Sequence, residues 1–248
     1  MQLSFEDKVV VVTGAGGGIG EGYAKRFAAE GMKVCVAEIN AEQGQRVADE
    51  INAAGGTAMF ARVDVSDEQS CIDCANAVKE AWGRIDYLVN NAAIFGGMKI
   101  EGYLNVDLKY LDKFMAVNVN GCLLMTRACV PHMPKGSAII NQSSTAAWMH
   151  TGFYAVAKLA VNGLTTSLAN ELGWRRIRVN AIAPGPTETE ALRTTVGDYA
   201  DELAKSIPAR RLGTPDDMAN AALYLLSDQA SWITGHIMNV DGGQLMRV

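Results

Sequence analysis

The sequence contains no excess of positive charge and no long apolar run. Its 22 Lys and Arg residues are outnumbered by 27 Asp and Glu residues, which gives a formal net charge of −5 and a pI of about 5.3. This balance lacks the basic footprint of proteins that bind nucleic acid or anionic lipid. No apolar stretch reaches the roughly 18 residues that a transmembrane helix needs. The sequence therefore predicts neither a nucleic-acid partner nor a membrane protein.

Cysteine and histidine are also scarce. The chain has five cysteines, an odd number, and three histidines without the spacing of metal ligands. Residues 1–7 have no basic region leading into an apolar one, so they do not resemble a signal peptide. We therefore expect a cytoplasmic protein without a metal site. Cys71 and Cys74 have C-x-x-C spacing, but they fall within a predicted helix and are interpreted as structural.

The sequence alternates between short β-rich runs and longer amphipathic stretches. The runs consist largely of Val, Ile and Ala, which is typical of parallel strands buried on both faces. Predicted strands are 8–13, 32–37, 57–63, 86–90, 137–141, 177–182 and 236–240. Predicted helices are 19–30, 41–54, 67–82, 110–130, 154–172 and 216–226. This order predicts one α/β domain over residues 1–248, with a Rossmann-type, doubly wound, seven-stranded parallel sheet. Residues 184–213 contain no clear strand and should lie at the carboxyl ends of the strands, where ligands bind.

A glycine-rich turn follows the first predicted strand and leads into a helix. Glycine allows the backbone to turn sharply and to approach a pyrophosphate without a Cβ in the way. The spacing from Gly14 through Gly18 to Gly20 is Gly-x-x-x-Gly-x-Gly, because Ile19 breaks the Gly-x-Gly-x-x-Gly alternative. The residues expected to hold the phosphates of a dinucleotide are Gly14, Gly16, Gly17, Gly18, Ile19 and Gly20.

Tyr154 and Lys158 are four residues apart in a predicted helix and therefore share one face. A free tyrosine has a pKa near 10 and is a poor base at neutral pH. The lysine ammonium is expected to lower this pKa by favouring the phenolate, and a positively charged cofactor bound beside the tyrosine would act in the same direction. Ser144 ends the fifth predicted strand and is expected to polarise a substrate carbonyl, with Ser143 as the alternative.

Together these motifs resemble the short-chain dehydrogenase/reductase family, and the resemblance runs through the whole chain. The matching stretches, besides the glycine turn, are Asn90-Asn91-Ala92-Ala93, Asn118 within 117–121, Asn141-Gln142-Ser143-Ser144, Tyr154 with Lys158, Pro184-Gly185 and Asp241-Gly242-Gly243. Ala93 stands where the family has glycine. The resemblance implies reversible hydride transfer between a nicotinamide and an alcohol carbon, with Tyr154 transferring the hydroxyl proton.

The resemblance also implies roles for individual residues. Lys158 would hydrogen-bond the nicotinamide ribose, and Asn118 would support a water linked to this lysine. Asp64 and Val65 would flank the adenine, and Asn90 would contact the adenosine side through its backbone. Thr187 and Thr189 would hold the carboxamide. The remaining expected cofactor contacts are Ala92, Tyr154, Pro184 and Gly185. The resemblance further implies a homotetramer in which the helices that carry Asn118 and Tyr154 pair across a two-fold axis.

The charge at the end of the second strand indicates the type of cofactor. Glu38 can accept hydrogen bonds from the adenosine ribose hydroxyls and would repel a 2′-phosphate. Gly16 and Gly17 carry no side chain, whereas relatives that bind the 2′-phosphate of NADP usually have Arg or Lys in this turn. The prediction is therefore NAD.

The segment 145–153, between Ser144 and Tyr154, is shorter than is common in the family and should wall the substrate pocket. The residues expected to supply apolar contact are Trp148, Met149, Phe153, Ile94, Phe95 and Leu192; the alternative is that they pack beneath the site. The expected substrate is a compact hydrophobic secondary alcohol or ketone, cyclic or aromatic. Two other functions stay open. One is reduction of 3-oxoacyl groups on an acyl carrier protein, and the other is a catalytically silent NAD-binding protein.

Overall fold

Buried β-branched runs form the centre of the molecule. The computed structural model describes residues 4–149 and 152–246. The strands are β1 (Val9–Thr13), β2 (Lys33–Glu38), β3 (Thr57–Arg62), β4 (Tyr87–Asn90), β5 (Ala138–Gln142), β6 (Arg178–Pro184) and β7 (Ile237–Val240). They pair in parallel in the order β3-β2-β1-β4-β5-β6-β7. The predicted doubly wound, seven-stranded sheet is confirmed.

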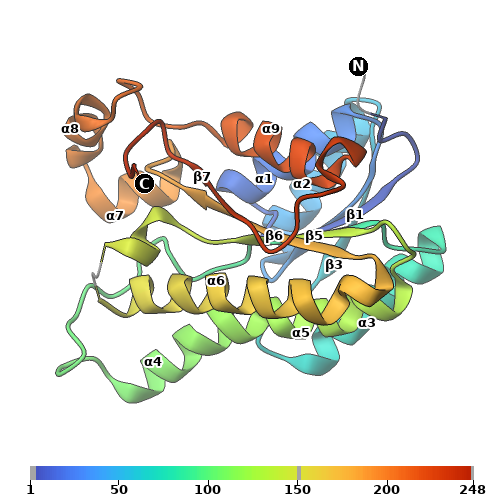
Figure 1. The fold of residues 1–248 in the computed structure, drawn as a ribbon, viewed down its shortest axis with the longest axis horizontal. Helices are drawn as coiled ribbons and strands as arrows, with labels where there is room; N and C mark the ends of the chain where they lie inside the picture. Colours follow the sequence, from blue (N-terminus) through green and yellow to red (C-terminus); the bar gives the residue numbers. More distant parts are fainter. Residues whose placement is uncertain (1–3, 150–151, 247–248) are drawn as a thin grey trace.

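Helices cover both faces of this sheet (Figure 1). On one face, α1 (Gly18–Ala29), α2 (Ala41–Ala53) and α9 (Pro215–Leu226) bury their apolar sides against β-strand residues such as Val10 and Val12. On the other face lie α3 (Glu68–Trp82), α5 (Gly121–Cys129) and α6 (Gly152–Leu172), packed against residues such as Val9 and Val11. Because successive strand residues point to opposite faces, the valines of one strand pack against the helices on both faces of the sheet.

Two regions differ from the sequence-based prediction. The expected helix 110–130 is divided into α4 (Leu108–Met115), a π-helical turn (Ala116–Asn120) and α5, followed by a 3-10 turn (Val130–His132). The strandless region 184–213 contains two short helices, α7 (Glu190–Val196) and α8 (Tyr199–Ser206). Three further 3-10 turns are Thr145–Trp148, Gly173–Arg175 and Asp228–Ala230. Of the expected pocket segment 145–153, His150 and Thr151 lie outside the described residues.

The strand order sets the position of a ligand site. From β1 the chain proceeds to β2 and β3 on one side of the sheet and returns to β4 on the other side. The connections therefore diverge at the carboxyl ends of β1 and β4, which leaves a crevice there. Within the described part of the chain, no helix is both long and apolar enough to cross a bilayer.

Candidate active site

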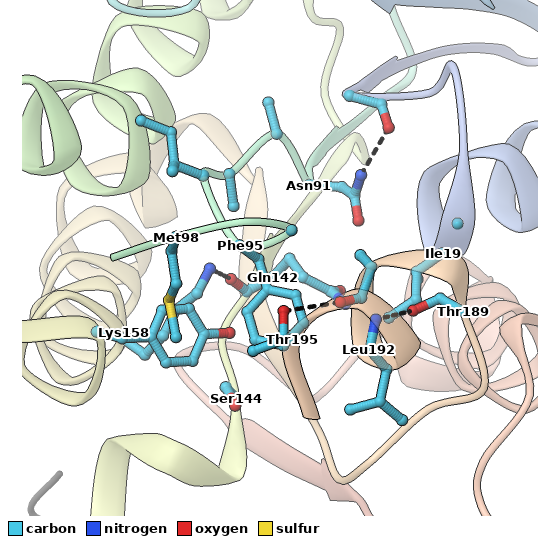
Figure 2. A pocket seen from close by; sticks show the side chains of 18 of the residues that line it. Ile19, Asn91, Phe95, Met98, Gln142, Ser144, Lys158, Thr189, Leu192 and Thr195 are labelled. Atoms are coloured by element: carbon cyan, nitrogen blue, oxygen red, sulfur yellow. Dashed lines mark hydrogen bonds between the residues drawn. The ribbon is translucent and has the colours of Figure 1, made fainter. Parts of the chain in front are cut away.

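A large cavity opens at this switch point and has a volume of ≈ 1370 Å³. Pockets of roughly 300–1,000 Å³ suffice for a drug-sized ligand, so this one has room for a dinucleotide and a substrate together. Figure 2 shows Ile19 and Asn91 along it with Phe95, Ser144 and Lys158. The expected cofactor contacts that line it are Gly14, Gly17, Gly18, Ile19, Gly20, Glu38, Asp64, Val65, Ala92, Tyr154, Lys158, Pro184, Gly185, Thr187 and Thr189. Gly16, Asn90 and Asn118 are not among the lining residues.

Glycine is required in the turn between β1 and α1 because the chain is crowded there. Gly14 has a φ of +63°, and a Cβ on it would lie 2.7 Å from the Cα of Ala92. A Cβ on Gly20 would lie 2.1 Å from the Gly14 carbonyl oxygen. The N-cap of α1, Gly17, supplies no side-chain hydrogen bond to the first turn. The first N–H groups of the helix are therefore available to an anion, which fits the phosphates of a dinucleotide.

Asn91 and Thr13 hold this turn in place, and the sequence reasoning gave neither a role. The Asn91 amide donates to the carbonyl oxygens of Thr13 (2.9 Å) and Gly14 (3.0 Å). The Thr13 hydroxyl accepts from the backbone N–H groups of Asn91 and Ala92, both at 3.0 Å. These contacts join the ends of β1 and β4. The side-by-side asparagines 90 and 91 were the available signal.

Asn90 points away from the cavity. Its side-chain amide donates to the Asn141 side chain at 2.9 Å and to the Cys122 carbonyl oxygen at 3.2 Å, and the residue is buried. Since neighbouring residues of a strand face opposite sides, Asn90 ties β4 to β5 and α5 while Asn91 faces the glycine turn.

Glu38 ends β2 and is fixed by backbone groups. One carboxylate oxygen accepts from the Gly16 N–H at 3.1 Å, and the other accepts from the N–H groups of Ile39 (2.9 Å) and Asn40 (3.0 Å). A Cβ on Gly16 would lie 2.8 Å from the Glu38 Cγ, so a side chain at position 16 would displace this glutamate. Gly16 thus acts on the cavity through Glu38, which lines it.

Tyr154 and Lys158 lie one turn apart on α6. The Lys158 Nζ is 5.7 Å from the centroid of the Tyr154 ring and donates to the Gln142 carbonyl oxygen at 2.8 Å. The ammonium group is thus fixed beneath the tyrosine by the last residue of β5. Gln142 is a third residue without a role in the sequence-based prediction, since its contribution comes from the backbone.

The two neighbouring serines face different partners. The Ser144 hydroxyl lies beside Tyr154 and lowers the pKa of its hydroxyl, and it also accepts from the Ala146 N–H at 3.1 Å. The Ser143 hydroxyl donates instead to the Asn162 side chain at 2.6 Å and is buried. Of the two candidates, only Ser144 presents its hydroxyl beside the tyrosine. A tyrosine, a serine and a lysine thus converge at one end of the cavity.

Comparisons with known proteins agree with this constellation. A family model described as enoyl-(acyl carrier protein) reductase matches residues 14–244. A short-chain dehydrogenase/reductase from Serratia marcescens has a TM-score of 0.89 at 33% identity, covering 97% of this chain and 98% of its own. The chain belongs to the short-chain dehydrogenase/reductase family. It is accordingly an oxidoreductase of a family that binds nicotinamide cofactors.

Relatives of this short-chain dehydrogenase/reductase differ in what is known of them. An uncharacterized oxidoreductase of Mycobacterium tuberculosis is 55% identical, with 98% of this chain and 99% of the relative aligned. The 7α-hydroxysteroid dehydrogenase of Escherichia coli K12 is 37% identical, with 97% and 95% aligned. A 2,5-dichloro-2,5-cyclohexadiene-1,4-diol dehydrogenase of Sphingobium indicum is 38% identical, with 95% of each aligned.

Two solved short-chain dehydrogenase/reductase structures carry different cofactors. A 3-ketoacyl-(acyl-carrier-protein) reductase from Brucella melitensis, complexed with NADH, has a TM-score of 0.88 at 38% identity and covers 98% of this chain and 100% of its own. A short-chain dehydrogenase from Burkholderia cenocepacia, complexed with NADP, has a TM-score of 0.89 at 32% identity, with 97% and 98% covered. The fold is therefore compatible with either dinucleotide.

The sequence-based expectation for the tyrosine pKa needs a correction. The chain's own groups do not lower it, because burial raises the pKa of Tyr154 to about 12 and the neighbouring Ser144 hydroxyl opposes this only in part. Burial also lowers the pKa of Lys158 to about 8, so its ammonium form still dominates at neutral pH. The lysine lies under the ring but does not offset the cost of burying a phenolate. Lowering of the tyrosine pKa therefore depends on the positive charge of an oxidised nicotinamide.

Asn118 occupies the π-helical turn between α4 and α5 and is fully buried. Its side-chain amide donates to the Phe114 carbonyl oxygen at 3.0 Å, while its Oδ1 has no hydrogen-bond partner within the described residues. A buried carbonyl oxygen without a partner is costly, which fits a bound water at this position. The unpaired Asn118 Oδ1 therefore supports the expected role of this residue, which is to bind a water linked to Lys158.

The expected nicotinamide-end residues lie on the wall formed by the segment after β6. The Thr187 hydroxyl donates to the Gly185 carbonyl oxygen at 3.0 Å. Thr189 is the N-cap of α7, where its hydroxyl accepts from the Leu192 N–H at 3.1 Å, as Figure 2 shows. Its methyl group lies 3.6 Å from the position of a Cβ on Gly18. The start of α7 therefore reaches across the cavity to the glycine turn.

The substrate end has an apolar wall, with one change from the expected set. The Phe95 ring is tilted by 44° to that of Tyr154 with 5.4 Å between the ring centroids, and Met98 is a further apolar lining residue. Phe153 borders the cavity, but its ring is buried in an apolar cluster with Phe114. The centroids of these two rings are 4.8 Å apart. Trp148 does not line the cavity. The other expected residues that line it are Ile94, Met149 and Leu192.

Proposed function

We propose that this enzyme transfers hydride between NAD(H) and a compact, hydrophobic secondary alcohol or ketone, cyclic or aromatic. The observation that carries the proposal is the position of Tyr154, whose hydroxyl lies beside Ser144 and whose ring centroid is 5.4 Å from that of Phe95. A proton donor and a polarising hydroxyl thus adjoin an apolar wall. A compact apolar ring can pack against this wall with its oxygen at Tyr154.

The side chains have distinct roles in the proposed reaction. In the direction of reduction, Ser144 orients the carbonyl oxygen, and Tyr154, protonated at neutral pH, donates a proton to it. The bound nicotinamide supplies or accepts the hydride. Lys158, held by the Gln142 carbonyl oxygen, keeps its ammonium under the tyrosine and favours the phenolate that proton donation leaves behind.

The preference for NAD(H) rests on Glu38. Its carboxylate accepts three backbone hydrogen bonds, so it is held at the end of β2 and cannot easily swing aside. A 2′-phosphate brought to this position would meet a fixed negative charge, whereas ribose hydroxyls would meet an acceptor.

Two characterised relatives support a ring-shaped substrate. The names of the Escherichia coli and Sphingobium indicum enzymes both specify a secondary alcohol on a ring, a steroid in one case and a cyclohexadiene diol in the other. The apolar lining of Phe95, Met98 and Leu192 suits such carbon skeletons.

Reduction of 3-oxoacyl thioesters is the second candidate, because a 3-ketoacyl-(acyl-carrier-protein) reductase is 38% identical. The two are separated by direct competition between a series of cyclic ketones and acetoacetyl thioesters at matched concentrations with NADH. We expect the ketones to be preferred. A preference of tenfold or more for the thioester, about 1.4 kcal/mol in transition-state binding, would favour the second candidate. Failure to turn over either class would revive a silent NAD-binding protein.

We further propose a homotetramer that works in the cytoplasm. Val156 and Leu159 project from α6 with 47% and 53% of their surfaces exposed, which suits pairing of this helix across a two-fold axis. All five cysteines are buried free thiols, as a reducing compartment favours. Light scattering should give four times the chain mass of 26.5 kDa, and a monomer at micromolar concentration would reject the oligomer.

A further inference from the structure

A polar side chain from the far end of the sequence reaches the substrate end of the cavity. Gln244 follows β7 and lines the cavity together with Ser144 and Pro184. The segment that carries it is fixed, because the Asp241 carboxylate accepts from the N–H groups of Gly243 (3.0 Å) and Leu245 (2.9 Å). The position of Gln244 is therefore set by the fold around Asp241.

Thr145 orients the Gln244 amide. The Thr145 hydroxyl lies 3.0 Å from the Gln244 Oε1 and 3.2 Å from the Pro184 carbonyl oxygen, and Thr145 is itself buried. Since Thr145 directly follows Ser144, this contact joins the serine segment, the last residue of β6 and the C-terminal segment. It occupies the amide oxygen of Gln244. The amide nitrogen has no hydrogen-bond partner in the described residues 4–149 and 152–246.

A donor without a protein partner favours a ligand that supplies an acceptor. The neighbouring wall is apolar, with Phe95 and Leu192, and the Thr195 hydroxyl already donates to the Ala191 carbonyl oxygen at 2.8 Å. A substrate that excludes water here would leave the Gln244 amide unpaired unless it carries an oxygen to accept from it. The reacting oxygen is not available for this contact, because Ser144 and Tyr154 bind it.

We propose that Gln244 is a specificity-determining residue that donates a hydrogen bond to a second oxygen of the substrate. The preferred substrates are then ring compounds that bear a hydroxyl or carbonyl group in addition to the one that reacts. This inference rests on the proposed function for the reacting oxygen. The second oxygen is a separate property, because a purely hydrocarbon ring ketone could also be reduced.

The test compares ring ketones of equal size. In the presence of NADH, kcat/KM is measured for 3- and 4-hydroxycyclohexanone and for the matching methylcyclohexanones, and for cyclohexane-1,4-dione. We expect the wild-type enzyme to prefer a hydroxylated compound at least tenfold over its methyl counterpart. Gln244→Leu should reduce this ratio to within about twofold. Gln244→Glu, which cannot donate when ionised, should lose activity on the dione while retaining it on the hydroxyl compounds, whose O–H can donate.

Controls separate a local effect from misfolding. Gln69→Leu removes an exposed amide from α3 and should leave the hydroxyl-to-methyl ratio unchanged. Thr145→Val should reduce the ratio in the same direction as Gln244→Leu, because it frees the amide to rotate. NADH affinity, measured by fluorescence titration, should be the same in wild type and Gln244→Leu, which shows that the variant is folded.

The outcomes distinguish this inference from the proposed function. Calorimetric binding of the same hydroxyl and methyl compounds to the NADH-loaded protein reads out the Gln244 contact even if no ketone is reduced. Absence of turnover for every ring ketone overturns the proposed function. Equal affinity and equal kcat/KM for the hydroxyl and methyl compounds in the wild type, or an unchanged ratio in Gln244→Leu, overturns the role of Gln244.

Discussion

The two ends of the cavity are built on different principles. At the adenosine end, polar groups are held by the backbone: the Glu38 carboxylate accepts three N–H groups, and Asn91 donates to two carbonyl oxygens. At the substrate end, apolar side chains come from the chain between regular sheet elements: Phe95 from the loop after β4 and Leu192 from the short helix α7 after β6. The first end is fixed by local backbone geometry, and the second by which side chains the connecting segments carry.

This difference explains what each end can specify. A carboxylate fixed by backbone groups discriminates between cofactors that differ by one charged group, because it cannot rearrange to accept both. An apolar wall discriminates mainly by shape and area, and one methylene is worth only about 1–3 kcal/mol there. Between the two ends lie Tyr154 and Lys158, on which both depend. Variants at the centre should therefore have larger effects than variants at either end.

The largest effect is expected at Tyr154. Tyr154→Phe removes the only group we assign to proton transfer, so kcat should fall by about 10²–10⁴-fold, while NADH affinity should persist because the ring remains. The measurement is steady-state turnover together with fluorescence titration of NADH. Tyr224→Phe, which removes a hydroxyl outside the cavity, is the matched control. Retention of more than about a tenth of wild-type kcat would place the acid elsewhere.

Lys158 should couple stability to pH. Its native pKa is lowered to about 8 from an unfolded value of 10.5, so between these pH values the unfolded chain binds more protons than the native one. Stability contributed by this site is therefore lowest below pH 8 and rises as the pH increases to 10.5. The free energy of unfolding of the wild type, minus that of Lys158→Met, should increase by up to about 3 kcal/mol over this window.

The same pair of proteins provides an internal control. Between pH 5 and 7 both the native and the unfolded wild type hold the lysine proton, so the difference in unfolding free energy should stay constant. Urea titrations at six or more pH values measure it. A difference that is flat through pH 8–10.5 would mean that Lys158 is solvated in the native protein.

Sequence patterns were informative where backbone geometry imposes residue types. Every strand was predicted to within two residues, because only strands buried on both faces have runs such as Val9–Val12. The glycine turn was predicted because no other residue fits at Gly14 and Gly20. At these positions local sterics alone select the residue, so one sequence suffices to find them.

The remaining features depend on contacts that a single sequence does not contain. The π-helical turn at Asn118 preserves helical periodicity on both sides, so helix 110–130 looked continuous. Asn90 and Asn91 are the same residue type, and they differ only in the direction of their side chains at the end of β4. The Asn90 side chain contacts Asn141, and that of Asn91 contacts the glycine turn. Trp148 was expected in the cavity wall on hydrophobicity, but the 3-10 turn that carries it does not bring it there. The raised pKa of Tyr154 reflects burial, which spacing along a helix does not reveal.

At the adenosine end, Glu38 should set cofactor choice. We expect kcat/KM with NADH to exceed that with NADPH by at least about tenfold, and Glu38→Arg to shift the ratio toward NADPH because it replaces a fixed anion by a cation. Glu42→Arg changes the net charge equally on the exposed start of α2 and should shift the ratio much less. Wild-type enzyme that uses NADPH as well as NADH would contradict this reading of Glu38.

The smallest effect is expected at Arg46, which contacts the carbonyl group of Gly16. Its guanidinium donates to the Gly16 carbonyl oxygen at 3.0 Å and pairs with Glu21 and Glu50, each at 2.8 Å. The Gly16 N–H meanwhile donates to Glu38. Gly16 is thus held through both of its adjacent peptide groups, by Glu38 at its N–H and by Arg46 at its C=O.

Arg46→Gln should therefore loosen Glu38 indirectly. Since a single partly exposed hydrogen bond contributes about 0.5–1 kcal/mol, the Kd for NADH should rise about two- to fivefold, and less at high salt. Lys25→Gln breaks ion pairs to the same Glu21 and Glu50 but does not contact Gly16, so it should have a smaller effect. Equal effects of the two variants would show that the surface charge, and not the contact with Gly16, matters. The Arg46–Gly16 contact would then not help to position the glutamate. The contrast between a fixed, polar adenosine end and an apolar substrate end would depend on the backbone hydrogen bonds of Glu38 alone.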